Sequence, residues 1–260
     1  MSFRVSLPGA EVLFSTREGG LSSGPFESLN LGLLTGDDRE LVIENRRRLA
    51  ARADVQPEDV VMGWQVHGTD IKEWDGRHAD TAFLDPQGGD LKVDGHLTRH
   101  QRLAALVLVA DCLPVAIAGG GTVAMLHCGW RGLAGGLIAK AAARMRELAA
   151  ADAPGSGLAA DAPRSGGDGA VLAAAVGPGI GSCCYEVGGE VLDAFADFDG
   201  VAEGRMLNLR AIAEQQLRAA GIDQVEHVDY CTSCHPELFF SHRRDNGVTG
   251  RQGGIAWLTG

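Results

Sequence analysis

Three side chains in the sequence have the types and spacing of a catalytic metal site. His67 lies just before Gly68 at the end of a predicted strand, Cys112 follows the apolar run 103–110, and His127 lies near the end of a glycine-turned hairpin. Two imidazoles and one thiolate leave the fourth position of a tetrahedral zinc ion open, which is typical of catalytic rather than structural zinc.

The hairpin is expected to bring two of these ligands together. With Gly119-Gly120 as a two-residue turn, counting outward along both strands sets Cys112 directly opposite His127. Directly opposed Cβ atoms lie roughly 4.5–5.5 Å apart, so both side chains could bind one ion. The inference depends on the register, because a three-residue turn would move the pair to opposite faces.

Other interpretations of the same residues stay open. Taken alone, a Cys that ends a buried strand is usually a small apolar side chain, and a lone His usually has a structural role. Alternatively, Cys112 is the nucleophile and His127 the base of a metal-free cysteine hydrolase or amidase. Such an enzyme would resist chelators, whereas a metal enzyme would not.

The remaining cysteines give weaker signals. Cys231-Thr-Ser-Cys234 is a C-x2-C unit beside His235, but the sequence contains no second such unit, which disfavours a structural zinc site. A thioredoxin-like redox role is also disfavoured, because no βα pattern follows the pair. Cys183 and Cys184 are adjacent, and we interpret them as packing or turn residues.

The elements that would position these residues occur in mixed order, which predicts an α+β fold. The run 103–110 has the length of a strand buried on both faces. Predicted strands cover 11–16, 59–66, 103–110, 115–118, 122–128, 170–176, 225–230 and 255–258. Predicted helices run from Asp37-Asp38 to about residue 53, over 133–150, near 189–198, and onward from a cap at Asn208.

The composition limits the classes of protein to which this chain can belong. With 260 residues and 45% hydrophobic side chains, the chain can bury a full core, and six cysteines at this length suit reduced thiols. We see no signal peptide, and the longest apolar run, of eight residues, is far shorter than the roughly 20 that span a bilayer. We therefore expect a cytoplasmic protein that does not bind membranes.

The net charge of −11 disfavours a nucleic-acid partner, because it repels phosphate backbones at long range. Small anionic ligands stay possible, since 20 of the 23 cationic residues are Arg, whose planar guanidinium group suits phosphate.

A series of short runs is distributed in one order along residues 11–258. The runs are Phe14-Ser-Thr-Arg-Glu-Gly-Gly20, Ser28-Leu-Asn-Leu-Gly32, Gln65-Val-His67, Ala110-Asp-Cys-Leu-Pro114, His127-Cys-Gly-Trp-Arg-Gly132, Gly177-Pro-Gly-Ile-Gly181 with Cys183-Cys184-Tyr185, and Phe240-Ser-His-Arg-Arg-Asp245 with Thr249-Gly-Arg-Gln252. Together they resemble the laccase-domain family. Its members were first named polyphenol oxidases and are now regarded as purine nucleoside phosphorylases.

The resemblance implies phosphorolysis of inosine, adenosine and methylthioadenosine, and deamination of adenosine to inosine. It also implies a metal site at His67, Cys112 and His127, and a layered α/β/β/α domain over residues 1–260 that is related to toxin-type cysteine hydrolases. The chain departs from the family pattern at Leu34, where many relatives carry His, and at Cys128, where many carry Ala.

The implied chemistry assigns roles to further residues. Asp111 adjoins a ligand and is our candidate proton carrier in deamination, with positioning of a His or capping of a turn as the alternative. Arg131, just before the helix expected from about residue 133, is the leading candidate for holding phosphate, and Arg17 and Arg243 are further candidates. A surface or structural ion pair is the alternative for each arginine.

Two rival functions make different predictions. A multicopper oxidase needs about ten histidines, several in His-x-His pairs. This chain has eight and no such pair, which leaves at most a single copper at the His₂Cys site and adventitious phenol oxidation. A non-enzymatic partner-binding protein would turn over no nucleoside.

Residues 152–169 are rich in Gly, Ala and Pro and have few large apolar groups, which predicts a flexible surface insertion. Replacing them with a short bridge should leave folding intact and nucleoside turnover within a few-fold, because they add little to the core. Thermal unfolding and a turnover assay of the deletion variant check this. Loss of folding or of turnover would mean that the segment packs against the domain.

Overall fold

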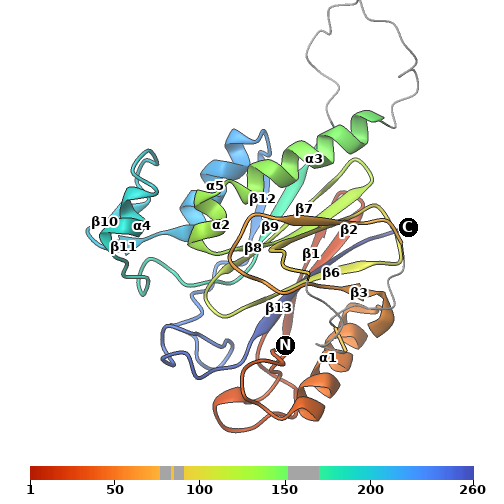
Figure 1. Cartoon of the computed structure of the whole chain (residues 1–260), viewed down its shortest axis with the longest axis vertical. Helices are drawn as coiled ribbons and strands as arrows, with labels where there is room; N and C mark the ends of the chain where they lie inside the picture. The colour runs from red at the N-terminus through yellow and green to blue at the C-terminus, as the bar shows by residue number, and fades with distance from the viewer. Residues whose placement is uncertain (77–82, 85–90, 152–169) are drawn as a thin grey trace, which may run out of the picture.

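The computed structural model describes residues 1–76, 83–84, 91–151 and 170–260, so the predicted insertion at 152–169 lies outside the described residues. Two mixed β-sheets form the centre of the fold (Figure 1). The five-stranded sheet has the order β1 (Ser2–Leu7), β2 (Ala10–Ser15), β13 (Gln252–Leu258), β6 (Ala104–Val109) and β3 (Val60–Val61). The six-stranded sheet has the order β12 (Gln224–His227), β9 (Ala173–Val176), β7 (Leu113–Gly119), β8 (Thr122–Cys128), β5 (Gly95–Thr98) and β4 (Ile71–Trp74).

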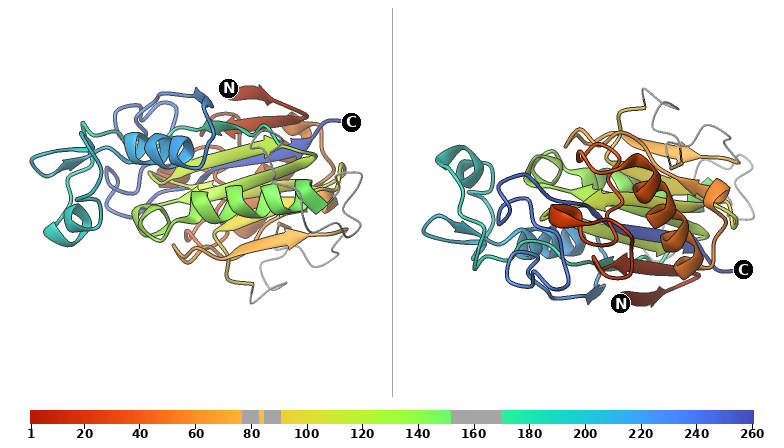
Figure 2. Two further views of the ribbon diagram at one scale, coloured as in Figure 1. Left: turned by 90° about the horizontal axis from the view of Figure 1, so that it is seen from above. Right: turned by 90° about the horizontal axis from the view of Figure 1, so that it is seen from below.

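Helices cover the outer faces of both sheets, which gives four layers. Helix α1 (Arg39–Ala53) packs on the five-stranded sheet, and α2 (Trp130–Ala134), α3 (Leu137–Ala151) and α5 (Leu209–Ala219) pack on the six-stranded sheet. In Figure 2, α3 is nearest the viewer from above and α1 from below. A third apolar core, between the sheets, contains small and medium side chains such as Val107, Ala116 and Met125. The α/β/β/α arrangement expected from the family resemblance is therefore present.

The predicted helix starts are confirmed at two caps. The side chain of Asp38 accepts hydrogen bonds from the backbone N–H groups of Glu40 and Leu41 at the start of α1, and Asn208 accepts one from Ala211 at the start of α5. The single helix predicted over 133–150 is instead two helices. The chain breaks between them at Gly135 and at Gly136, whose φ is 78°.

The β7–β8 hairpin corrects the predicted register. Gly119 pairs with Thr122, so the turn residues are Gly120 and Gly121, both with positive φ, rather than Gly119-Gly120. Three consecutive glycines allow either pair, and the sequence alone could not choose between them. Because each partner shifts by two residues, the faces are preserved, but Cys112 now lies opposite Gly129, one step beyond the end of the ladder.

Several other element boundaries also differ. The strand predicted over 59–66 is reduced to β3, because the chain leaves the sheet after Val61, and His67 lies in an irregular segment with φ of 60°. The predicted helix at 189–198 is the shorter α4 (Gly189–Asp193). Strands β1, β4 and β5 and the small ribbon of β10 (Ala202–Glu203) and β11 (Met206–Leu207) were not predicted. The polar, Gly- and Asp-rich composition of residues 75–92 predicts an excursion on the surface, but the described Phe83 is fully buried, so that prediction is wrong for this residue.

The link between β6 and β7 passes from one sheet to the other. Residues Ala110 to Cys112 make this crossing, and Asp111 adopts a φ of 95°. The prediction that β6 delivers Asp111-Cys112 at its end is thus confirmed, and these residues lie where the two sheets approach each other. In the described part of the chain, no helix is long and apolar enough to cross a membrane.

Candidate active site

The structure brings the three predicted ligands together from three segments. The ligand atoms of His67, Cys112 and His127 all lie within 4.8 Å of one another, and the two imidazole rings meet edge-on with centroids 4.8 Å apart. His127 is buried on β8, Cys112 is partly buried in the sheet crossing, and His67 is exposed. A site with one face open to solvent has room for a fourth, exchangeable ligand.

The buried carboxylate of Asp94, which the sequence analysis missed, orients the site. The β5–β8 register pairs Gly95 with Leu126 and so sets Asp94 opposite His127. Nδ1 of His127 lies 2.7 Å from Oδ1 of Asp94. A carboxylate can only accept, so Nδ1 carries the proton and Nε2 keeps the lone pair that a metal ion needs.

The same carboxylate holds the irregular segment that carries His67. Its oxygens accept hydrogen bonds from the backbone N–H groups of Val66, His67 and Gly68, at 3.1, 2.9 and 2.7 Å. Burial alone would raise the pKa of Asp94, but the hydrogen bonds from His127 and Gly68 outweigh it and hold the pKa below its usual value. Asp94 therefore stays ionised and fixes two of the three ligands at once.

The environment of Cys112 favours its thiolate. Burial raises the pKa of the thiol, but the charge of His127 and hydrogen bonds from both histidines lower it to about 6. For His127, burial lowers the pKa, and the opposing effects of Cys112 and Asp94 raise it to about 9. Without a metal ion the proton thus lies on the imidazole, and a divalent cation would replace it as the partner of the thiolate.

Gly129 provides the space for this pair of ligands. A Cβ atom at this position would lie 3.0 Å from Sγ of Cys112 and 3.1 Å from Cδ2 of His67. These contacts are closer than carbon and sulfur normally allow. A side chain at position 129 would therefore have to displace two of the candidate ligands by a few tenths of an ångström.

A cavity of about 580 Å³ opens from the ligands, a volume typical of small-molecule sites. Four of its described lining residues are arginines, Arg46, Arg131, Arg243 and Arg251, whereas Asp111 is the only carboxylate among them. The remaining lining residues include His67, Cys112, His127, Gln65, His242, Tyr185, Trp130, Trp64, Leu34 and Met62. The cavity is thus strongly cationic although the chain has a net charge of −11.

Two of the three predicted phosphate ligands line this cavity. Arg131 lies in the first turn of α2, rather than before the helix as predicted, and its guanidinium stacks 4.3 Å from the ring centre of Trp130. Arg243 stacks 5.0 Å from the ring centre of Tyr185 and donates to the carbonyl of Glu186. Both stacked guanidinium groups keep N–H donors for a ligand, because stacking uses only the face of the plane.

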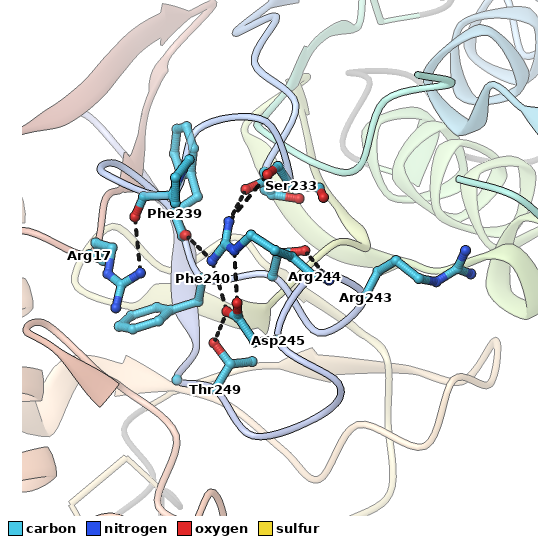
Figure 3. A network of polar contacts seen from close by, with 12 residues as sticks. Arg17, Ser233, Phe239, Phe240, Arg243, Arg244, Asp245 and Thr249 are labelled. Carbon is cyan, nitrogen blue, oxygen red and sulfur yellow. Dashed lines mark hydrogen bonds and ion pairs between the residues drawn. The ribbon is translucent and has the colours of Figure 1, made fainter. Parts of the chain in front are cut away.

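Arg17 does not reach the cavity. It stacks on Phe240 and donates to the carbonyls of Glu27 and Pro236, beside a separate pocket. In Figure 3, Arg243 extends away from the pair formed by Arg244 and Asp245, on the side opposite Arg17. Arg17 thus joins two loops through their backbone carbonyls. Arg251, which was not predicted, lines the cavity.

Asp111 lines the cavity, but both of its oxygens already accept hydrogen bonds. Oδ1 accepts from the hydroxyl of Thr232 at 2.6 Å, and Oδ2 accepts from the backbone N–H of Arg243 at 2.7 Å. The carboxylate thus joins the sheet crossing to the C-terminal loops. Arg251, Tyr185, His242 and Gln65 lie in the runs that the sequence analysis quoted, whereas Asp94 lies in none of them.

Comparison with known proteins decides the family. The chain matches the family model of the multi-copper polyphenol oxidoreductase laccases over residues 11–259. It belongs to the laccase-domain family. The resemblance read from the sequence is therefore confirmed.

Relatives in this family align with nearly the whole chain. Purine nucleoside phosphorylase YlmD of Geobacillus stearothermophilus is 36% identical, over 94% of this chain and 88% of its own length. Purine nucleoside phosphorylase YfiH of Escherichia coli is 33% identical, over 96% of this chain and 94% of its own. The crystal structure of YlmD from Geobacillus stearothermophilus superimposes with a TM-score of 0.83 at 33% identity, covering 97% of this chain and 93% of that one.

Substituting Cys112→Ala should lower bound zinc by about one ion per chain while the fold stays intact, because the thiolate is the only anionic ligand of the three. Elemental analysis of the purified variant, with circular dichroism as a check on folding, measures this. Cys128→Ala is the matched control, since it removes a neighbouring thiol that is buried in the helix-side core. Unchanged zinc in Cys112→Ala would show that the ion binds elsewhere.

Substituting Asp94→Asn should weaken zinc binding by roughly 10- to 100-fold, the usual effect of removing the carboxylate behind a metal-bound His. The amide has nearly the same size, but it can donate to Nδ1 of His127 and so stabilise the wrong tautomer. Competition with a chromogenic chelator gives the affinity. A folded variant with zinc affinity within two-fold of the native value would contradict the role of Asp94.

Proposed function

We propose that this protein is a zinc-dependent purine nucleoside phosphorylase that acts on inosine, adenosine and methylthioadenosine and also deaminates adenosine. The observation that carries the proposal is the opening of a His₂Cys centre into a cavity lined by four arginines. A neutral nucleoside alone would not require such a charge, whereas a phosphate co-substrate would. The names of the relatives support the same chemistry.

Phosphorolysis transfers the ribose from the base to phosphate. An oxygen of phosphate forms a bond to C1′, the C1′–N9 bond breaks, and the base leaves with a proton to give ribose 1-phosphate and free purine. Arg131 and Arg243 are suited to hold the phosphate, because their stacked guanidinium planes lose little freedom on binding an anion. Arg251 adds positive charge to the same wall, and its N–H groups donate to the carbonyls of Thr249 and Gly250.

The rim of the cavity offers a surface for the purine ring. Trp64 is 47% exposed and Leu34 is 68% exposed, and both side chains line the cavity. Exposed large apolar groups beside a polar cavity can stack with a flat base. Tyr185 adds a hydroxyl donor, since burial above all raises its pKa to about 12.

Deamination of adenosine exchanges the amino group at C6 for oxygen and releases ammonia. A zinc ion at this site would supply Lewis acidity and lower the pKa of a bound water toward 7. His67, Cys112 and His127 would hold the ion, and Asp94 orients His127 through the contact with Nδ1. Asp111 is the proposed proton carrier, but its two hydrogen bonds support the alternative that it positions Cys112 and the loop at Arg243.

The described residues do not provide the several copper sites that the family model's description suggests. Within the described ranges, the only other group of three or more metal-ligating side chains consists of cysteines, so no histidine cluster for further copper ions accompanies the centre. A single copper ion at the same three ligands, with phenol oxidation as its activity, stays the alternative.

A metal-free cysteine hydrolase or amidase is the second candidate. It is favoured by one observation, namely that Cys112 and His127 hydrogen-bond and that the pKa of the thiol falls to about 6. His67 lies beside the same thiolate as a third possible ligand, and this favours a metal ion instead. Kinship with toxin-type cysteine hydrolases and a cytoplasmic location remain predictions from the sequence.

Arg131→Ala separates the two proposed reactions. Losing a charge-assisted contact of about 1.5–3 kcal/mol should slow phosphate-dependent release of adenine roughly ten- to a hundred-fold. Conversion of adenosine to inosine uses water and should change much less. Both products are quantified from adenosine with and without phosphate in the same assay.

Arg144→Ala is the control for the loss of an arginine, because Arg144 pairs with Glu73 and Glu147 on the exposed face of α3. Equal loss of both reactions in Arg131→Ala would mean that Arg131 binds the nucleoside or maintains the site. Absence of phosphate-dependent adenine release from the native protein would reject the phosphorylase proposal itself.

A further inference from the structure

Four cysteines outside the active site form a second cluster. Their Sγ atoms all lie within 4.8 Å of one another, and none is in a disulfide. Sγ of Cys234 lies 3.5 Å from that of Cys183 and 3.4 Å from that of Cys184. Cys231 completes the group. The four residues come from two loops about 50 positions apart in the sequence, so only the fold brings them together.

The sulfur spacing is that of a tetrahedral metal site. Four thiolates at about 2.3 Å from a zinc ion lie roughly 3.8 Å from one another. The observed separations of 3.4 and 3.5 Å are close to this value and much longer than the roughly 2.05 Å of a disulfide. Packing alone gives no reason for four polarisable thiols to converge at a surface where Cys183 and Cys234 are exposed.

The backbone around Cys231 favours the thiolate form of this residue. The N–H of Gly181 donates to Sγ of Cys231 at 3.2 Å, and the N–H of Cys234 also donates to it. Gly181 leaves the space that the sulfurs fill, since a Cβ there would lie 3.1 Å from Sγ of Cys183 and 3.2 Å from Cβ of Cys231. Backbone donors stabilise negative charge on sulfur, which a metal-bound thiolate carries.

We propose that Cys183, Cys184, Cys231 and Cys234 bind a second zinc ion with a structural role. Four protein ligands leave no open position, unlike the active-site centre. The sequence alone disfavoured such a site, because Cys231-Thr-Ser-Cys234 lacks a second C-x2-C unit. The structure supplies the missing half from the adjacent pair Cys183-Cys184.

The second site would fasten two loops that form one wall of the active-site cavity. The loop after β9 carries Cys184 and then Tyr185, which lines the cavity. The loop after β12 carries Cys231 and then Thr232, whose hydroxyl holds Asp111 beside the active-site thiol. The loops are otherwise joined near this point by backbone hydrogen bonds between Gly179 and the residues Tyr230 and Thr232. A zinc ion would thus maintain the wall without touching substrate.

Zinc stoichiometry tests this proposal independently of enzyme activity. Protein produced with zinc in the medium should contain about two ions per chain by elemental analysis. Cys112→Ala and the double variant Cys231→Ser, Cys234→Ser should each contain about one, while Cys128→Ala keeps two. Native protein with one ion, together with none in Cys112→Ala, would overturn the second site. Iron in place of zinc would overturn the assignment of a structural zinc ion.

X-ray absorption on the Cys112→Ala variant covers the case in which the double variant fails to fold. The remaining zinc should then have four sulfur neighbours at about 2.3 Å and no imidazole neighbours. A mixed nitrogen and sulfur shell would contradict the proposal. So would a disulfide among the four cysteines in freshly purified native protein, as detected by mass spectrometry without reduction.

Discussion

The hydrogen bond between Asp94 and His127 is the interaction on which the active site depends. One buried carboxylate fixes the tautomer of His127 and, through three backbone N–H groups, the irregular segment that presents His67. An ionised carboxylate can be buried only where enough donors surround it, and here these donors are the ligand-bearing segments themselves. The carboxylate and the ligands therefore stabilise each other, and loss of either should disturb both.

The second constraint is the crossing of the chain between the two sheets. Cys112 reaches the histidines because the link from β6 to β7 changes sheets beside the end of β8. Asp111, in the same link, binds Thr232 and the backbone of Arg243, so the crossing also fixes the C-terminal loops around the cavity. The result is a cationic pocket on a protein with a net negative charge.

The sequence identified the three candidate ligands that the structure brings together, but it did not predict their placement correctly. Local signals identified the caps at Asp38 and Asn208, and apolar patterning identified β6. The hairpin turn was predicted one residue too early, because the sequence cannot distinguish among three consecutive glycines. The candidate ligands still lie on the predicted face of the sheet, because the strand partners differ from the predicted ones by two residues. Asp94 was missed because its partners lie in two other segments, and the cysteine cluster because its halves meet only in the fold. Such long-range contacts have no local signature.

Metal reconstitution measures the central claim most directly. Protein stripped of metal would be assayed for formation of hypoxanthine and ribose 1-phosphate from inosine and phosphate, before and after addition of zinc or copper. We predict that turnover disappears with the metal and returns once zinc occupies the His67, Cys112 and His127 centre. Full turnover in the stripped protein, or recovery with copper alone, would contradict a zinc-dependent phosphorylase.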